Sequence, residues 1–248
     1  FSELDKHYMA RAIELAAQGR FTTAPNPNVG SVIVRDGEIV GEGYHRQAGG
    51  PHAEVFALRQ AEHLASGATC YVTLEPCSHY GRTGPCALAL VNAGVKKVVV
   101  AMLDPNPLVA GRGIQILQDA GIEVQVGLLE EQARALNPGF LSRMERQKPY
   151  IRLKLATSLD GRIALANGKS QWISSPESRS DVQLMRAKAH AILSTATTVL
   201  ADNARLTVRS EGLAITSLED GSVRQPIRVI LDRGLKLTGR ELLFSQNG

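Results

Sequence analysis

The chain has 248 residues, of which 44% are hydrophobic and 21% are charged. A globular domain usually takes about 100–200 residues, so this length allows one large domain or two modest ones. The ordinary apolar content excludes a disordered or collagen-like chain. No apolar run approaches the roughly 18–20 residues that span a bilayer, and residues 1–6 lack the apolar core of a signal peptide. These features predict a soluble, cytoplasmic protein.

The charge pattern bears on the kind of partner. There are 28 basic and 24 acidic residues, which gives a formal net charge of +4, and the basic residues are spread along the chain. A nucleic-acid surface normally gathers Lys and Arg into a stripe and adds aromatic residues for base stacking, whereas 4% of this chain is aromatic. We therefore expect no nucleic-acid or membrane partner. A small anionic substrate such as a phosphate ester is compatible with this balance.

The first half of the chain alternates helical and strand patterns. In chain order we predict a helix at 5–18, a hairpin of strands at 29–34 and 39–44, a helix at 53–65, a strand at 68–74, a helix at 86–92, a strand at 98–102, a helix at 113–120 and a strand at 122–126. The helix at 53–65 would place Val55, Leu58, Ala61 and Leu64 on its apolar face. This order predicts an α/β layered domain.

A second domain is predicted to begin where charged residues and Pro149 interrupt this pattern, so we divide the chain into 1–147 and 148–248. The predicted elements beyond the boundary are a strand at 150–156, a helix at 177–187, and strands at 191–194 and 227–231. They indicate an α/β domain with polar loops after its strands. No G-x-G-x-x-G fingerprint is present, so the pattern alone gives no argument for dinucleotide binding.

Three cysteines gather beside a histidine and a glutamate in the first half. Cys77 and Cys86, together with His52, match the three-ligand pattern of a catalytic zinc ion whose fourth position holds water. Nitrogen and thiolate ligands favour zinc over magnesium or calcium. Glu54 lies two residues from His52 and would not bind the metal. We expect it to move protons while zinc-bound hydroxide attacks the substrate.

This pattern is similar to the H-x-E and P-C-x-x-C signature of zinc-dependent base deaminases. It differs because eight residues, 78–85, separate the two cysteines instead of two. The alternatives from the residues alone are a structural zinc site and buried thiols. Cys70 matches no ligand position and is predicted to be a small core residue in a strand.

The inserted segment carries His79 and Arg82, which could bind a polar or phosphorylated group of the substrate. The alternative is a surface loop that zinc holds in place without any substrate contact.

Four motifs resemble the bifunctional riboflavin-biosynthesis deaminase/reductase family. They are Pro25-Asn26-Pro27-Asn28-Val29-Gly30, Gly49-Gly50-Pro51-His52-Ala53-Glu54, Leu74-Glu75-Pro76-Cys77-Ser78-His79-Tyr80-Gly81-Arg82-Thr83 and Asp104-Pro105-Asn106-Pro107. The resemblance implies a cytidine-deaminase-like domain that deaminates a diaminopyrimidinone bearing a phosphoribosylamino group. Zinc would bind His52, Cys77 and Cys86, with Glu54 as the proton shuttle. Asn26, His79 and Arg82 would contact the substrate.

The second half resembles the reductase domain of the same family, whose fold is like dihydrofolate reductase. The resemblance rests on the runs Ser158-Leu159-Asp160-Gly161, Ser170-Gln171-Trp172-Ile173 and Thr198-Val199-Leu200-Ala201-Asp202. It implies that NADPH reduces the ribosyl group to a ribityl chain. The residues at cofactor-contacting positions are Ala156, Trp172, Thr198 and Asp202. Those at substrate-contacting positions are Lys154, Ser170, Arg186, Leu206 and Arg209, and Asp160 is a further candidate. Arg186 and Arg209 are suited to clamp a phosphate, because a guanidinium offers a two-pronged donor.

The resemblance covers nearly the whole chain but stops before the glycine-rich segment with which the family completes its NADPH phosphate site. We therefore expect the reductase domain to be incomplete in this chain. The family resemblance is also compatible with a homo-oligomer. Two other classes of function compete with this interpretation. A zinc-dependent nucleoside or RNA base deaminase is disfavoured by the cysteine spacing and the reductase-like second half. A non-catalytic zinc-binding module is disfavoured by Glu54.

Overall fold

The computed structural model describes residues 1–80, 84–107 and 109–245. The contacts between residues group the chain into two compact units, Phe1–Tyr150 and Ile151–Gly248. Within the described ranges, no helix is long and apolar enough to cross a membrane.

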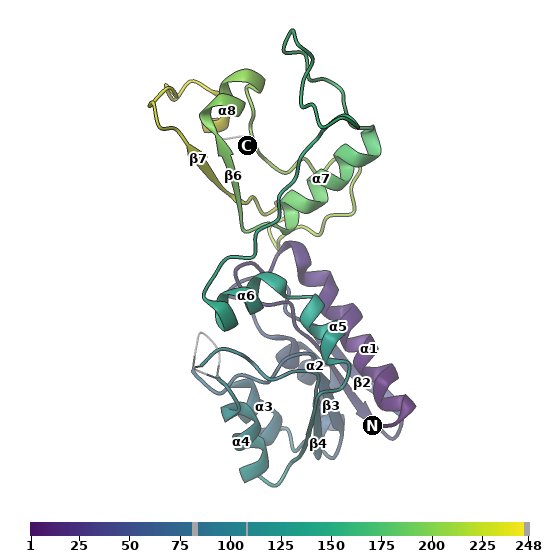
Figure 1. Ribbon diagram of the computed structural model, residues 1–248. Coiled ribbons are helices and arrows are strands. Elements are labelled where there is room, and N and C mark those ends of the chain that lie inside the picture. Colours follow the sequence, from purple (N-terminus) through teal and green to yellow (C-terminus); the bar gives the residue numbers. More distant parts are fainter. Residues whose placement is uncertain (81–83, 108, 246–248) are drawn as a thin grey trace. The chain divides into compact units, whose positions relative to one another are not determined.

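The first unit is built on a five-stranded mixed sheet with the strand order β2-β1-β3-β4-β5 (Figure 1). Strand β1 pairs antiparallel with β2 and β3, whereas β3, β4 and β5 are parallel. The strands are β1 (Gly30–Arg35), β2 (Glu38–Tyr44), β3 (Thr69–Val72), β4 (Lys97–Val100) and β5 (Glu123–Val126). The helices are α1 (Glu3–Gln18), α2 (Ala53–Ala61), α3 (Cys86–Asn92), α4 (Arg112–Asp119), α5 (Glu130–Ala135) and α6 (Pro138–Arg146). This arrangement confirms the predicted α/β layers, to which the unpredicted helices α5 and α6 are added.

Helices cover both faces of this sheet. Val32 and Val99 lie in a buried cluster with residues of α1, α5 and α6. Their chain neighbours Ile33 and Val98 lie in a second cluster with residues of α2, α3 and α4, because successive side chains of a strand point to opposite faces. Figure 1 accordingly shows α3 and α4 on one side of β4 and α1 on the other. Burial of both faces explains why these strands are continuous apolar runs in the sequence.

Helix α2 packs very close to the sheet because small residues face one another. A Cβ on Gly41 would lie 2.2 Å from the Ala57 carbonyl oxygen, and a Cβ on Gly43 would lie 2.4 Å from the Ala53 carbonyl oxygen. Both alanines are fully buried. The N-terminus of α2, where the predicted zinc ligand and proton shuttle lie, is therefore positioned by backbone-to-backbone contact with β2.

The apolar face predicted for this helix is largely wrong. Ala61 is buried, but Val55 and Leu58 are half-buried and Leu64 is 38% exposed. The helix ends at Ala61 and continues as a short 3-10 turn, η2 (Glu62–Ala65). Close packing against the glycines of β2 admits alanine and excludes the larger side chains, so the helix turns its small residues to the sheet.

The second unit contains a parallel pair of strands, β6 (Ala191–Thr195) and β7 (Ile227–Leu231). Its helices are α7 (Pro176–Lys188) and α8 (Ala196–Asp202), and a 3-10 turn, η3, spans Leu242–Phe244. The Ser175 hydroxyl caps α7 by accepting the Ser178 N–H at 3.2 Å. A small core of Val199, Leu206 and Leu243 packs beside β7. The helix and the two strands predicted at 177–187, 191–194 and 227–231 are therefore confirmed.

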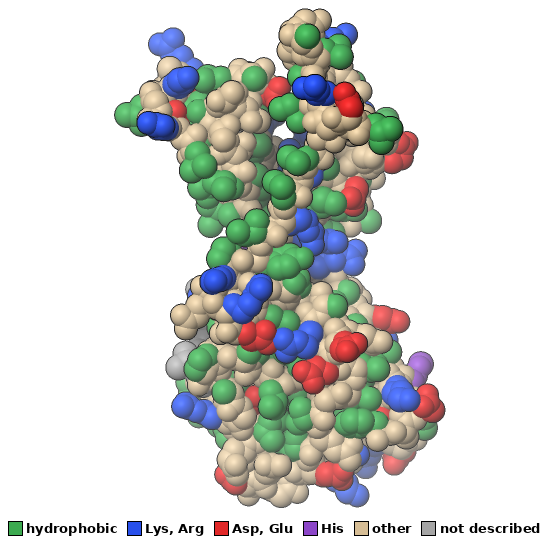
Figure 2. All heavy atoms as spheres, in the orientation of Figure 1, with side chains coloured by type: hydrophobic (Ala, Val, Ile, Leu, Met, Phe, Trp, Pro, Cys, Tyr) green, Lys and Arg blue, Asp and Glu red, His purple; other side chains and the backbone are tan. Residues whose placement is uncertain are grey.

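The strand predicted at 150–156 is wrong, because the structure forms no strand there. Ile151 and Leu153 are each 80% exposed, and Leu155 is 66% exposed. Their alternation is typical of a strand with one buried face, but a strand also needs a neighbour that pairs with its backbone. Figure 2 shows hydrophobic side chains at the surface of this unit.

We predict that Gly43→Ala destabilises the first unit by about 1–3 kcal/mol, because the new methyl group overpacks β2 against α2. Its Cβ would lie 2.6 Å from the Phe56 Cβ as well as against the Ala53 carbonyl. Urea unfolding measures the change. Gly139→Ala in α6 is the matched control, since a Cβ there meets nothing within 4 Å; it should be neutral or stabilising by roughly 0.5–1 kcal/mol. Equal stability of the two variants would contradict the close-packing account.

Candidate functional site

Three predicted metal ligands meet where two helices begin and a strand ends. His52 is the residue before α2, with an extended backbone (φ −79°, ψ 167°). Cys86 is the first residue of α3. Cys77 follows β3 and Pro76, and its thiol accepts the Cys86 backbone N–H at 3.3 Å. The start of α3 therefore provides one ligand and holds the other in place.

The ligand atoms of these residues all lie within 4.8 Å of one another. His52 Nδ1 is 3.2 Å from Cys86 Sγ and 3.5 Å from Cys77 Sγ. Cys70 lies apart from this group: its thiol is fully buried on β3 and 3.4 Å from Ser31 Oγ. One imidazole nitrogen and two sulfurs at such spacing are the donor set of a catalytic zinc site. The residues fit the metal.

The electrostatics of the group favour a cation. The Cys86 thiol first, and then the His52 imidazole, lower the pKa of Cys77 to about 4, so Cys77 is a thiolate at neutral pH. The same Cys77 contact, together with burial, raises the pKa of Cys86. The hydrogen bond to Cys77 raises the pKa of His52. A bound divalent cation would let both sulfurs ionise and would keep the imidazole neutral.

Glu54 lies beside the ligands in the first turn of α2 and is 3% exposed. Burial raises its pKa to about 7, which suits a group that takes and returns protons at neutral pH. In the described part of the chain, its Oε2 atom is the buried side-chain oxygen without a hydrogen-bond partner. Buried polar atoms are nearly always paired, so this oxygen is placed to hydrogen-bond a molecule bound beside the metal ligands.

Asn26 is held near the ligands through a second histidine. The Asn26 side-chain amide contacts His45 Nε2 at 3.1 Å, and His45 Nδ1 lies 3.0 Å from the Pro51 carbonyl oxygen. Burial lowers the pKa of His45, so the neutral ring donates from Nδ1 to Pro51 and accepts from Asn26 at Nε2. The His45 and His52 rings are 5.6 Å apart. His45 is absent from the sequence predictions, although it follows β2 at the sheet edge that carries the site.

The loop of Asn26 is fixed to the segment between α5 and α6 by a pair of asparagines. The Asn28 backbone N–H donates to Asn137 Oδ1 at 2.7 Å, and Asn137 Nδ2 donates to the Asn28 carbonyl at 2.9 Å. Asn28 Nδ2 also donates to the Leu136 carbonyl at 3.0 Å. The helices that the sequence patterns missed therefore hold the loop beside the metal ligands.

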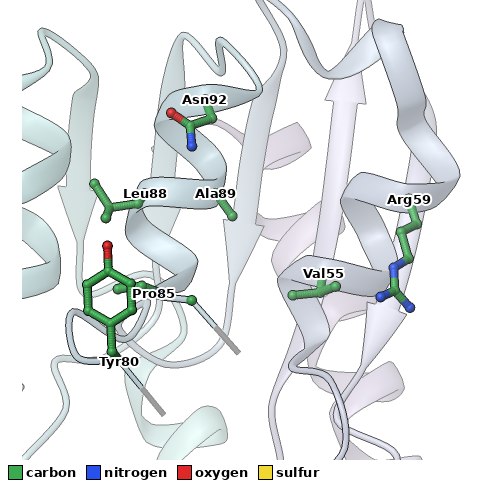
Figure 3. A pocket seen from close by; sticks show the side chains of 8 residues that line it. Val55, Arg59, Tyr80, Pro85, Leu88, Ala89 and Asn92 are labelled. Carbon is green, nitrogen blue, oxygen red and sulfur yellow. The ribbon is translucent and has the colours of Figure 1, made fainter. Parts of the chain in front are cut away.

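The segment between the two cysteines is partly described. His79 is exposed. Burial raises the pKa of nearby Asp104, although the hydrogen bond from the Asn106 backbone N–H opposes that rise. Arg82 lies outside the described residues. Beside this segment, a hollow of about 460 Å³ separates α2 from α3 (Figure 3). Its lining residues are Val55, Arg59, Tyr80, Gly84, Pro85, Leu88, Ala89 and Asn92.

In the second unit, the predicted phosphate-clamping residues come together. Arg186 on α7 is half-buried and donates from Nη1 to the Thr207 carbonyl at 3.0 Å. The Arg209 backbone N–H donates to Gln183 Oε1 on the same helix at 3.1 Å. Leu206 is buried in the same stretch. Burial first and the Arg209 charge second lower the pKa of Arg186.

The other predicted reductase residues are more scattered. Trp172 is 70% exposed, with the Arg179 guanidinium 4.4 Å from its ring centroid. Thr198 lies in the first turn of α8, where its N–H contacts the capping Thr195 hydroxyl, and Asp202 ends that helix. The remaining predicted residues, Lys154, Ala156 and Ser170, lie in a stretch that forms neither helix nor strand.

Two family models match the chain. The model described as "Cytidine and deoxycytidylate deaminase zinc-binding region" matches residues 2–102, and "RibD C-terminal domain" matches residues 149–247. These matches agree with the deaminase and reductase resemblances found from the motifs.

Relatives of known name match nearly the whole chain. It is 58% identical to the riboflavin biosynthesis protein RibD of Escherichia coli, over 98% of this chain and 67% of that one. The corresponding protein of Haemophilus influenzae is 57% identical, over 98% and 66%. The chain thus spans about two thirds of the length of these relatives.

Solved structures agree. RibD of Acinetobacter baumannii superposes with a TM-score of 0.91 at 56% identity, over 97% of this chain and 67% of that one. A deaminase/reductase of Thermotoga maritima superposes with a TM-score of 0.87 at 42% identity, over 99% and 68%. The predicted fold class, zinc and NADPH as cofactors, and the pairing of a deaminase with a reductase are confirmed. The chain belongs to the RibD family of riboflavin biosynthesis proteins.

Proposed function

We propose that residues 1–147 deaminate a diaminohydroxyphosphoribosylaminopyrimidine and that residues 148–248 contribute to NADPH-dependent reduction of the product. The Thermotoga maritima relative is described as a deaminase and reductase of these two compounds. The observation that carries the proposal is the buried Glu54 carboxylate, with one unpaired oxygen, beside three residues that could hold one metal ion. A purely structural zinc site has no use for such a carboxylate.

In this proposal His52, Cys77 and Cys86 hold zinc. Zinc, when bound, supplies a Lewis acid that makes water nucleophilic near neutral pH. Glu54 takes a proton from the attacking water and gives it to the ring nitrogen. It then moves the proton of the newly added hydroxyl group to the departing amino group. One water is consumed and one ammonia is released, while the amino carbon becomes a carbonyl carbon. The pKa of about 7 lets Glu54 act in both directions.

The substrate is oriented by the loop that Asn137 holds. The Asn26 amide uses one N–H toward His45, which leaves its oxygen and a second N–H for the edge of the base. His79, which is exposed, and Arg82 are proposed to contact the phosphoribosyl group. Their place between Cys77 and Cys86 ties that contact to the metal ligands.

For the reductase, Arg186, Arg209, Leu206, Ser170 and Lys154 are proposed to contact the ribosyl phosphate substrate. Ala156, Trp172, Thr198 and Asp202 are proposed to contact NADPH, which, when bound, supplies the hydride. The support is the contact between α7 and residues 207–209: Arg186 of α7 donates to the Thr207 carbonyl, and the Arg209 backbone N–H donates to Gln183 of α7. Two neighbouring guanidinium charges are favourable when an anion lies between them.

The proposed partners are small molecules. Over the first unit, Figure 2 shows basic and acidic side chains interspersed rather than gathered by sign, which favours a small substrate over a nucleic acid. The described cysteines are free thiols, which suits the proposed cytoplasmic location.

Glu54→Gln should keep its zinc but lose ammonia release by about 10²–10⁴-fold, the usual contribution of a positioned acid–base group. The amide cannot carry the proton, while the metal ligands are unchanged. Coupled detection of ammonia together with zinc analysis measures both effects. Glu131→Gln, at an exposed position on α5, is the control. Full activity of the Glu54 variant would refute the proton-shuttle role.

Cys77→Ala should lose the metal, whereas Cys70→Ala should retain about one zinc per chain. Both variants delete a thiol near the end of β3, but the Cys70 thiol lies in the core rather than in the ligand group. Elemental analysis of purified protein measures zinc content. Equal zinc in the two variants would show that the ligand set is wrong.

Arg209→Ala should raise the KM for the deaminated phosphate substrate by roughly 10–100-fold, since a hydrogen bond to a charged group contributes about 1.5–3 kcal/mol. The readout is substrate-dependent NADPH oxidation by a chain extended to the length of its RibD relatives, so that the glycine-rich segment expected to complete the NADPH site is present. Arg205→Ala, at an exposed position four residues earlier, should have little effect. Formation of the deaminated product alone, with no NADPH oxidation, would contradict the reductase assignment.

A further inference from the structure

One buried carboxylate in the first unit takes no part in the proposed chemistry. Glu75 follows β3, two residues before Cys77, and is 3% exposed. Its side chain accepts four backbone N–H groups. Oε2 accepts from Asp104 at 3.2 Å and Gly111 at 3.0 Å, and Oε1 accepts from Gly113 at 2.9 Å and Ile114 at 3.4 Å.

These donors belong to the loop after β4 and to the first turn of α4. Gly111 is the residue before α4, and Gly113 and Ile114 are inside it. The positive end of the helix dipole and the unpaired N–H groups of a first turn stabilise a carboxylate there. The Glu75 backbone N–H also donates to the Met102 carbonyl at 3.0 Å. Glu75 thus joins the ends of β3 and β4 to the start of α4.

Close packing against the same start of α4 also holds this segment. A Cβ on Gly113 would lie 2.0 Å from the Pro76 carbonyl oxygen and 3.2 Å from Glu75 Oε1. The backbone of residues 75–76 therefore rests directly on the start of α4. Cys77 is the next residue, so the position of its thiol depends on this packing.

We propose that Glu75 is a positioning residue for the metal site. By accepting the four backbone N–H groups of the loop after β4 and the start of α4, it fixes the Pro76–Cys77 segment where Cys77 can share a metal ion with His52 and Cys86. The inference rests on the proposed zinc ligands.

Glu75→Gln tests this inference with little change of shape. The amide keeps one oxygen, but its NH2 group would face backbone N–H donors and leave them unpaired. We expect the zinc dissociation constant to rise by about 10–100-fold, as when the hydrogen-bond partners of metal ligands are removed. Competition between the folded chain and a chromophoric chelator for Zn²⁺ measures it. Glu131→Gln, the same change at an exposed position, should bind Zn²⁺ like the unmodified chain.

The absorption spectrum of the Co²⁺-loaded protein distinguishes displacement of Cys77 from a general loss of stability. At saturating Co²⁺, displacement of Cys77 should shift and weaken the thiolate-to-metal absorption band of the Glu75→Gln chain. A band identical to that of the unmodified chain, or a zinc affinity within twofold of it, would overturn the inference. If Glu75→Gln does not fold, Glu75→Asp keeps the charge but shortens its reach. Glu75→Asp should then raise the zinc dissociation constant by less than the roughly 10–100-fold expected for Glu75→Gln. A zinc affinity equal to that of the unmodified chain would overturn the inference.

Absence of zinc binding by the unmodified chain would instead refute the proposed ligand set itself. If the unmodified chain and the Glu75 variants bind Zn²⁺ equally well, the positioning role of Glu75 is refuted but the ligand set is not.

Discussion

The close approach of α2 to the sheet is the constraint on which the site depends. His52 and Glu54 can reach the end of β3 because Gly41 and Gly43 let the backbone of α2 rest on β2. A strand with ordinary side chains at these positions would hold the helix farther out, by about the size of a methyl group. The cluster at the metal site, whose ligand atoms lie within 4.8 Å of one another, would then open.

The site gathers ionisable groups in a partly buried place, and each shifts the pKa of its neighbours. Cys77 is a thiolate, Cys86 is a thiol with a raised pKa, and Glu54 is buried with one unpaired oxygen. Ionising both sulfurs and Glu54 together would be costly unless a cation balanced their charges. The protein supplies part of that balance from backbone N–H groups, as at Cys77. A bound metal ion would supply the rest, and the raised pKa of Glu54 suits the proton-carrying role proposed for it.

Residues that take part in the chemistry through the type of their side chain could be predicted from the sequence. The His52, Glu54, Cys77 and Cys86 spacing could be recognised because helix starts and strand ends are marked by local patterns. Two kinds of feature were beyond its reach. His45 and Asn137 act through hydrogen bonds to segments that are distant in the sequence. Glu75 acts through hydrogen bonds from backbone N–H groups, and these cannot be recognised from residue types. The prediction of a strand at 150–156 was wrong because alternating hydrophobic residues indicate which face of a strand would be buried, but not which strand it would pair with.

The proposal that His52, Cys77 and Cys86 bind zinc is tested most directly by X-ray absorption spectroscopy at the zinc edge of the zinc-loaded chain. We expect two sulfur neighbours at about 2.3 Å and one imidazole nitrogen at about 2.0–2.1 Å, with a further light-atom ligand in the open position. A shell of oxygen and nitrogen neighbours alone, or one with three sulfurs, would contradict it. The third sulfur would have to come from Cys70, which the structure places in the core.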